Sequence, residues 1–415
     1  MRLYRDVAPT MLLASVLALV ILLTLLGCRD DAESPTAPGP ALATTATTAL
    51  AFYQVSAGQD HSCGVTTDNR AFCWGFYGLG TQPVALGDGS TKGSLTPVAV
   101  AGGLHFRQIS AGFAATCGVT TDFRAYCWGA NELGELGDGT TTRSLTPVPV
   151  AGGHQFRQVE TNFEQACGVS YPDNRVYCWG RNSDGQLGNG TNTGPETGQF
   201  GPYSSKPVAV VGTLVFRQVS AGYYHMCGVT TDNRAFCWGL NKYGQIGDSS
   251  TAYRRLKPSR VAGTRQFRQI DAGAYHSCAV TTGDRAFCWG DGRQGQVGNG
   301  KAYLSFWPKA VAGGLSFSRV SGGLYHTCGE TTGNRAYCWG DNRFGQLGDG
   351  TEINRLTPVA VVGGLFFSQV SAGDFQTCGR SDAAVAYCWG TNFLGELGDG
   401  TRTKRLTPVP VAGTM

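Results

Sequence analysis

The sequence predicts an all-β fold, a seven-bladed β-propeller with four-stranded blades, on three observations. A hairpin motif that ends in Cys-Trp-Gly occurs seven times along the chain. The Trp residues of these motifs follow one another at intervals of about 50 to 59 residues, a period typical of repeat architectures. Each repeat reads as four short β segments without a helical period of useful length. Four-stranded units repeated in this way, with apolar residues on both faces, favour a propeller.

Residues 1–27 have the layout of a lipoprotein-type signal peptide. Arg2 and Arg5 precede an apolar run from Met11 to Leu26, which is short for a transmembrane helix. The run ends in Leu-Leu-Gly before Cys28, which resembles the bacterial lipobox, where the signal is cut before a cysteine that becomes lipidated. We therefore predict lipidation of Cys28; the alternative is an uncleaved anchor helix with an incidental cysteine.

Residues 28–51 begin with the lipidated Cys28 and continue as a stretch rich in Ala, Thr and Pro. This composition lacks an apolar period and predicts a disordered tether. The propeller is then expected over residues 52–415. The layout places the protein in a bacterial cell envelope, lipid-anchored on the periplasmic or cell-surface side, where disulfides persist.

The Cys-to-Cys segment of the first repeat reads as a β-hairpin. Val65 and Phe72 belong to β-forming runs on either side of a polar turn, which predicts a loop of roughly three residues. In this register Cys63 lies opposite Cys73 and Gly64 faces Phe72, so that an aromatic covers a strand glycine. The two sulfur atoms then lie on one face, within reach of a disulfide.

Fourteen of the fifteen cysteines fall into seven such pairs. The predicted disulfides are Cys63–Cys73, Cys117–Cys127, Cys167–Cys178, Cys227–Cys237, Cys278–Cys288, Cys328–Cys338 and Cys378–Cys388. Two alternatives are reduced core thiols and a zinc site that uses His61 with the cysteines. The equivalents of His61 in three repeats are Ala115, Gln165 and Gln376, although the Cys pair persists there. We therefore expect disulfides, and neither a metal nor a cofactor.

The two ends of the repeat region suggest how the ring closes. The first repeat starts at Phe52 without a preceding Thr-Pro-Val strand, whereas the last repeat finishes with such a strand at residues 406–411. A propeller must hide its free sheet edges. We therefore expect the N- and C-terminal strands to close one blade together.

Residues 325–351 carry Tyr-His-Thr-Cys-Gly, then Asn-Arg-Ala-Tyr-Cys-Trp-Gly and Gly-Gln-Leu-Gly-Asp-Gly-Thr. This unit resembles the repeat of the regulator of chromosome condensation family, and the resemblance covers residues 52–413. It implies a seven-bladed propeller. Founding members are nucleotide exchange factors for a nuclear GTPase, and a secreted bacterial relative inhibits β-lactamases by pressing one propeller face onto the enzyme. The export signal and cysteine pairs set this chain apart from the nuclear members.

Strand parity places the turns before the first Cys of each pair, and the long loops after Trp-Gly, on one face. The repeats differ from one another there, and insertions on one face often mark a binding face. Aromatic residues gather at these positions, as in interface anchors. The candidate binding face is Phe113, Phe163, Phe200, Tyr203, Tyr223, Tyr224, Tyr275, Tyr303, Phe306, Trp307, Tyr325 and Phe375. The alternative is that these aromatics cap the channel and the blade ends.

The composition and the residue pattern argue against two classes of function. A formal net charge of +4 with 15% charged residues is too small for a nucleic-acid binder. No catalytic constellation stands out, so we do not expect an enzyme. The favoured hypothesis is a monomeric protein-protein interaction module with an unknown envelope or extracellular partner, attached to the membrane through its lipid alone. The alternatives are an exchange-factor-like regulator of a small GTPase and a glycan-binding propeller.

Overall fold

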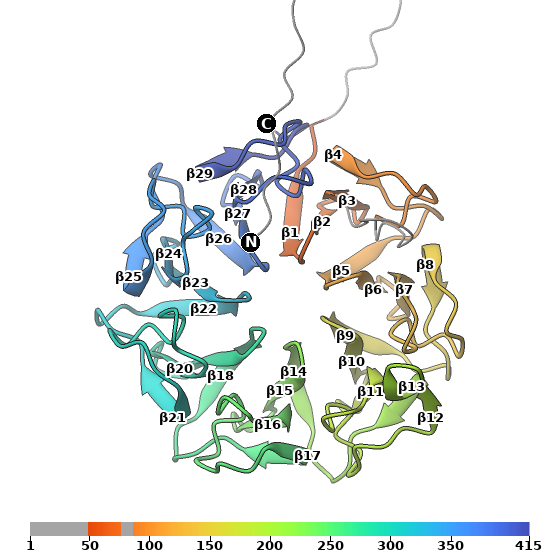
Figure 1. Ribbon diagram of the computed structural model, residues 1–415. Coiled ribbons are helices and arrows are strands. Elements are labelled where there is room, and N and C mark those ends of the chain that lie inside the picture. Colours follow the sequence, from red (N-terminus) through yellow and green to blue (C-terminus); the bar gives the residue numbers. More distant parts are fainter. Residues whose placement is uncertain (1–48, 76–85, 415) are drawn as a thin grey trace, which may run out of the picture. The chain divides into compact units, whose positions relative to one another are not determined.

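The computed structural model describes residues 49–75 and 86–414. These residues form seven antiparallel sheets arranged around a central axis (Figure 1), which confirms the predicted all-β, seven-bladed propeller. The predicted signal peptide, Cys28 and nearly all of the tether lie outside the described residues. The described ranges contain no helix long and apolar enough to cross a membrane.

Each blade consists of consecutive strands, and their order in the chain follows their order from the axis to the rim (Figure 1). The innermost strands are β1 (Phe52–Ala57), β5 (Phe106–Ala111), β9 (Phe156–Thr161), β14 (Phe216–Ala221), β18 (Phe267–Ala272), β22 (Phe317–Gly322) and β26 (Phe367–Ala372). The second strands, which carry the first Cys of each pair, are β2 (His61–Thr66), β6 (Ala115–Thr120), β10 (Gln165–Ser170), β15 (His225–Thr230), β19 (His276–Thr281), β23 (His326–Thr331) and β27 (Gln376–Ser381).

The third strands, which carry Cys-Trp-Gly, are β3 (Ala71–Gly75), β7 (Ala125–Gly129), β11 (Val176–Arg181), β16 (Ala235–Leu240), β20 (Ala286–Gly290), β24 (Ala336–Gly340) and β28 (Ala386–Gly390). The outer strands are β4 (Ser94–Ala99), β8 (Ser144–Pro149), β13 (Gly201–Ala209), β17 (Arg254–Arg260), β21 (Ser305–Ala310), β25 (Arg355–Ala360) and β29 (Arg405–Pro410). The third blade has a fifth strand, β12 (Glu196–Gly198), because part of the long loop after its Trp-Gly folds into a hairpin with β13.

The expectation that the N- and C-terminal strands share one blade is wrong. The first blade is complete within residues 52–99, and β29 pairs with β28 of its own repeat. The reason is that every outer strand has the same partner: Val98 lies opposite Cys73 in the first blade, and Val409 lies opposite Cys388 in the last. The C-terminal strand is therefore already paired and cannot be donated to the first blade.

The ring closes instead through contacts between the inner strands of the first and last blades. Gln369 Nε2 donates to Val55 O, and Val55 N donates to Gln369 Oε1, both at 3.0 Å. The Ala57 amide donates to Ser371 Oγ, also at 3.0 Å. Because similar bonds join other neighbouring blades, the closing joint resembles those within the chain.

The predicted hairpin register is confirmed. Cys63 lies opposite Cys73, and Thr66 N donates to Arg70 O at 2.9 Å, which leaves a loop of three residues. All seven predicted disulfides are formed, with Cα–Cα distances of 4.0 to 4.1 Å. His61 does not act with these sulfurs: its Nε2 lies 2.7 Å from Thr116 Oγ1 of the next blade. The zinc alternative is thereby excluded for this pair.

The aromatic that covers the strand glycine differs from the expected one. A Cβ on Gly64 would lie 2.6 Å from the ring of Phe52, in the neighbouring strand β1, and not against Phe72. Phe72 is the cross-strand partner of Gly64, but its ring packs edge to face with Phe52 in the same core cluster, with ring centroids 6.4 Å apart. The pairing register thus correctly predicts the residue opposite Gly64. The direction of the side chains decides which ring fills the space beside this glycine.

The core lies between blades and is organised around the Trp of each Cys-Trp-Gly. Trp74, Trp128, Trp179, Trp238, Trp289, Trp339 and Trp389 are fully buried. The indole of one blade meets the long loop of the preceding blade: Trp179 Nε1 donates to Glu135 O at 2.9 Å, and Gly137 packs on the ring. The last blade meets the first in the same way, since Trp74 Nε1 donates to Glu396 O at 3.0 Å.

We predict that Gly398→Ala destabilises the propeller far more than Gly364→Ala. Both glycines have left-handed backbones, with φ of +69° and +70°. A Cβ at 398 would lie 2.6 Å from Trp74 Cδ1, whereas at 364 nothing lies within 4 Å. The control therefore costs about 1 kcal/mol of backbone strain, and Gly398→Ala costs about 2 kcal/mol more because it overpacks the closing joint. Denaturant unfolding measures both, and equal losses would contradict this account of closure.

Candidate binding face

The propeller has two chemically different faces. The loop face carries the turns between the first and second strands and the long loops between the third and fourth strands. The hairpin face carries the Cys-to-Cys hairpin loops and the Gly-Gly turns. This division follows the predicted strand parity, because successive antiparallel strands of a blade end on alternate faces.

On the loop face, the turns of the blades converge at the axis and form an aromatic plug. Tyr223, Ala274 and Leu324 are buried at its centre. Around them pack Phe113, Phe163, Tyr224, Tyr275, Tyr325 and Phe375, all half-buried. Adjacent turns approach so closely that a Cβ on Gly58 would lie 2.4 Å from Gly112 O, which explains glycine at the start of the turn.

The plug is held by ring packing. Phe113 and Phe163 meet edge to face with ring centroids 4.8 Å apart, and Phe163 stacks on Tyr223 at 5.1 Å. These are the separations at which aromatic pairs attract each other. The structure thus brings together seven of the predicted aromatic residues at the axis, where Tyr223 is buried and the other six stay half-buried.

The other predicted aromatics lie farther out. Phe200 is 55% exposed at the tip of the β12–β13 hairpin, and Tyr303 is 40% exposed in the long loop before β21. Tyr203 pairs with Arg181 and Glu196 within the third blade. Phe306 packs on Gly244 of the preceding blade's loop, and Trp307 is exposed in the outer strand β21. Phe306 therefore contributes to a blade joint.

Sequence reasoning missed five further side chains of this face. Tyr243 and Phe344 pack edge to face on the plug residues Tyr275 and Phe375, at 5.3 Å in both cases. Tyr253, Ile353 and Phe393 are exposed in the long loops of the fourth, sixth and seventh blades, respectively. Their signal in the sequence is that the residues that follow Trp-Gly also differ between repeats.

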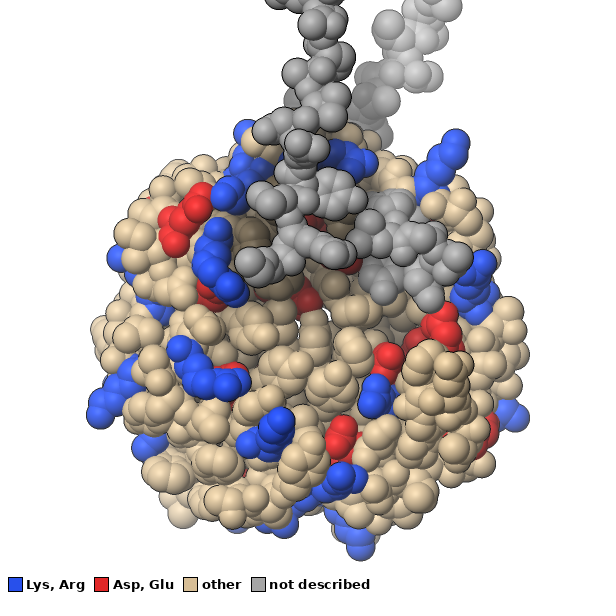
Figure 2. Space-filling model, viewed as in Figure 1, with Lys and Arg blue, Asp and Glu red and all other residues tan. Residues whose placement is uncertain are grey.

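The axis of the loop face also holds buried acidic groups. The Tyr223 hydroxyl donates to the Asp374 carboxylate. Burial raises the pKa of Asp374 to about 7, although the Tyr223 hydrogen bond lowers it in part. Burial and the nearby Glu396 raise the pKa of Asp60 to about 7. Beside the plug, Arg181 and Glu164 form an ion pair at 2.6 Å. Figure 2 shows both signs interspersed on a mostly uncharged surface.

Four fully buried histidines join blades near the plug. His61, His225, His276 and His326 each place Nε2 at 2.7 to 2.9 Å from a Ser or Thr hydroxyl of the next blade. These histidines therefore have a structural role, because each can hydrogen-bond to the next blade. Burial lowers their pKa, to about 4 for His61 and His276 and to about 3 for His225 and His326.

These histidines predict a loss of stability in acid. The pKa of His225 is near 6.5 in the unfolded chain and about 3 in the folded one, so stability is complete above pH 6.5 and falls as the pH drops toward 3. His225→Gln will flatten this slope by about 1 kcal/mol per pH unit between pH 6 and 4. Gln is accommodated at the equivalent position 165, where its Nε2 donates to Gly222 O at 2.8 Å.

Denaturant unfolding across this pH range provides the measurement. Buried carboxyl groups such as Asp374 act in the opposite direction, because their raised pKa values make stability fall as the pH rises toward 7. They are common to both proteins and cancel in the comparison. His105→Gln, at an exposed position, is the control. A slope as steep in His225→Gln as in the parent protein would rule out this origin of acid sensitivity.

Comparison with known proteins agrees with this architecture. The RCC1-like domain family matches residues 85–415, and the regulator of chromosome condensation (RCC1) repeat matches residues 52–76. The ultraviolet-B receptor UVR8 of Arabidopsis thaliana is 30% identical over 258 residues, which are 61% of this chain and 56% of UVR8. The human probable E3 ubiquitin-protein ligase HERC6 is 32% identical over 127 residues, 30% of this chain and 12% of HERC6. The chain thus spans about half of the first relative's length and a small part of the second's.

Solved structures share the fold at low sequence identity. Prp20p from Saccharomyces cerevisiae has a TM-score of 0.70 at 19% identity, over 88% of each chain. Human WBSCR16 has a TM-score of 0.67 at 19% identity, over 78% of this chain and 85% of the other. Since the family match extends over most of the sequence, the chain belongs to the RCC1-like domain family.

Proposed function

We propose that this protein is an exported, lipid-anchored propeller that binds a protein partner through its loop face. One observation carries the proposal: five consecutive blades, the third to the seventh, each expose a large apolar side chain in a long loop of this face. They are Phe200 (55% exposed), Tyr253 (53%), Tyr303 (40%), Ile353 (60%) and Phe393 (59%).

This arrangement has the composition of an interface. Single exposed apolar residues are ordinary on protein surfaces, but a set repeated around one face marks an interaction site. Aromatic anchors surrounded by paired polar groups are typical of the centre and rim of protein-protein interfaces. The half-buried plug adds a pre-organised apolar centre, so that binding would order few additional side chains.

The family supports a protein partner. The yeast relative Prp20p binds Gsp1p and histones, and it has been solved in complex with Kap60. Seven disulfides favour an oxidising compartment for this chain, whereas exchange factors of cytoplasmic or nuclear GTPases work where thiols stay reduced. We therefore favour an envelope or extracellular partner over a GTPase.

Mass spectrometry of the protein from its native membrane, with free thiols blocked, tests the location. We expect a mature chain that begins at a lipidated Cys28 and contains seven disulfides, because the lipobox-like sequence ends the apolar run. An unprocessed N-terminus would contradict the anchor. Free thiols would contradict export and return the GTPase-regulator hypothesis to first place.

Loss of partner capture tests the loop face. We predict that Phe200→Ala, Tyr253→Ala and Phe393→Ala combined reduce capture from envelope extracts at least roughly tenfold, since exposed anchors commonly dominate binding energy. Their side chains are about half exposed, so the fold should persist. The readout is quantitative proteomics of the captured proteins relative to the parent propeller.

The matched control replaces exposed apolar residues of the hairpin face, Val215→Ala and Phe366→Ala. An equal effect of both sets would indicate nonspecific adhesion and contradict the proposal. Protease treatment of the extract should abolish capture, whereas capture that survives proteolysis and is lost on deglycosylation would identify the propeller as a glycan binder.

A further inference from the structure

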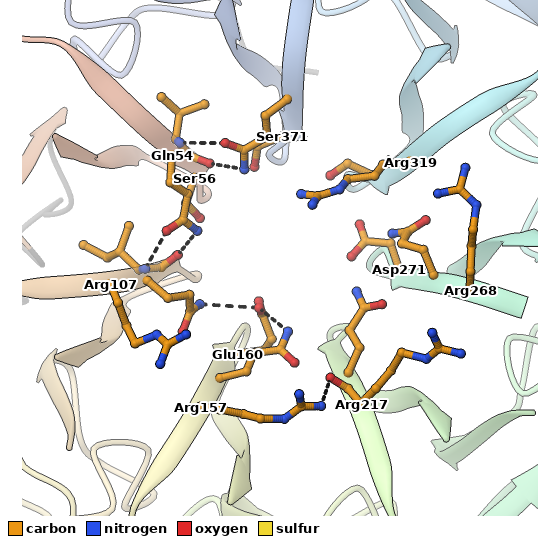
Figure 3. A pocket seen from close by; sticks show the side chains of 18 of the residues that line it. Gln54, Ser56, Arg107, Arg157, Glu160, Arg217, Arg268, Asp271, Arg319 and Ser371 are labelled. Atoms are coloured by element: carbon orange, nitrogen blue, oxygen red, sulfur yellow. Dashed lines mark hydrogen bonds between the residues drawn. The ribbon is translucent and has the colours of Figure 1, made fainter. Parts of the chain in front are cut away.

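A funnel-shaped cavity runs along the axis from the hairpin face. Its volume is about 1030 Å³, and residues of all seven innermost strands line it (Figure 3). Hairpin-loop residues, among them Phe123, Tyr171 and Asn174, contribute to its wall and place its mouth on the hairpin face. Toward the loop face, the aromatic plug around Tyr223 obstructs the axis. A cavity of this size and shape suits a small molecule.

The lining follows the residue order of the inner strands. A middle layer is formed by Gln54, Gln108, Gln158, Gln218, Gln269, Arg319 and Gln369. The glutamines are committed to the blade joints: Gln54 Nε2 donates to Ile109 O at 2.8 Å, and Ile109 N donates to Gln54 Oε1 at 2.9 Å. Their amides are therefore occupied by structure and leave recognition to other side chains.

Arginines supply the distinctive chemistry of the funnel. Arg107, Arg157, Arg217 and Arg268 occupy one position of four consecutive inner strands, and Arg319 joins them from the next blade (Figure 3). The equivalents of the first four in the other blades are Tyr53, Ser318 and Ser368. Since the blades fold with Tyr or Ser at this position, arginine is not required by the propeller itself.

The guanidinium groups retain unused donors. Arg157 Nη2 donates to the carbonyls of Phe216 and Arg217, and Arg217 Nε donates to Thr230 O at 3.3 Å. Each guanidinium has five N–H donors. Within the described ranges, Arg157 Nε, Arg217 Nη2 and Arg268 Nε are buried without a hydrogen-bond partner. Because these three atoms are buried, a ligand in the cavity would contact the other N–H groups of the guanidinium.

Four of the five arginine charges of the funnel are not balanced by a salt bridge within the described residues. Of these five arginines, Arg268 alone forms a salt bridge among the described residues, at 2.7 Å to Asp284. The two carboxyl groups of the lining, Glu160 and Asp271, instead accept hydrogen bonds from neighbouring blades, as from Ser110 Oγ at 3.1 Å and Gly322 N at 2.7 Å. Burial, with the charges of Arg107 and Arg217, lowers the pKa of Arg157, which reflects this crowding of like charges.

We propose that this funnel binds a small-molecule polyanion, a compound with two or more phosphate or carboxylate groups. Guanidinium groups match both oxyanions through paired N–H donors, and charge-assisted bonds of this kind are strong. Several arginines around one cavity favour a ligand whose charges are distributed over more than one group. This site lies on the opposite face from the proposed protein interface and is independent of it.

Calorimetric titration with sodium tripolyphosphate and, separately, with citrate tests the proposal. We expect one ligand to bind per propeller in at least one titration, more weakly as salt is added. Arg157→Ser combined with Arg217→Ser should weaken binding roughly tenfold or more, because two charge-assisted contacts are lost. Serine occupies this position in two blades, so the variant should fold; if it does not, Arg217→Ser alone should weaken binding severalfold.

The matched control removes two arginines from hairpin loops of the same face, Arg234→Gln with Arg285→Gln. It changes the net charge equally and should leave affinity within about twofold, since surface charges interact weakly through water. Absence of binding to both probes at millimolar concentration would overturn the proposal. Equal weakening in the control, or binding of a sulfated polymer that the funnel variant retains while small polyanions fail to bind, would also overturn it.

Discussion

The joint between a long loop and the next blade's tryptophan is the interaction on which the propeller depends. A single four-stranded blade leaves an apolar face uncovered and has no core of its own. The loop glycine lets the backbone reach the indole ring, and the loop carbonyl accepts its N–H, so an apolar and a polar requirement are met at once. Because Trp74 receives the same contact from the last blade, the ring closes without exchange of a strand.

The disulfides reinforce a different level of the structure. Each joins two strands within one blade, about ten residues apart, and so constrains a hairpin and not the ring. Loops this short contribute on the order of 2 to 3 kcal/mol each in the chain-entropy view. The inner glutamines and serines provide the complementary links between blades, as Gln54 does toward Ile109. Because the disulfides and the bonds between blades hold the strands, the sequences of the loops can vary.

The loops of the two faces carry different kinds of side chain. On the loop face, turns forced together at the axis create an aromatic plug, and loops around it expose apolar side chains such as Ile353 and Phe393. On the hairpin face, the channel stays open and gathers arginines that the joints do not need. A protein partner on one face and a small anion on the other would be compatible, since the plug separates the two regions.

The sequence alone determined the blade count, the hairpin register, the cysteine pairing and the aromatic character of one face, because these depend on periodicity and strand parity. Tertiary structure decided how the ring closes, since the pairing of β29 depends on its own blade. It also decided that Phe52, not Phe72, covers Gly64. The arginine funnel was hidden for a physical reason: a register shift between Phe106 and Gln108 interrupts the alternation of β5, so that Arg107 and Gln108 line the same cavity. Only the closed ring brings arginines from five blades together.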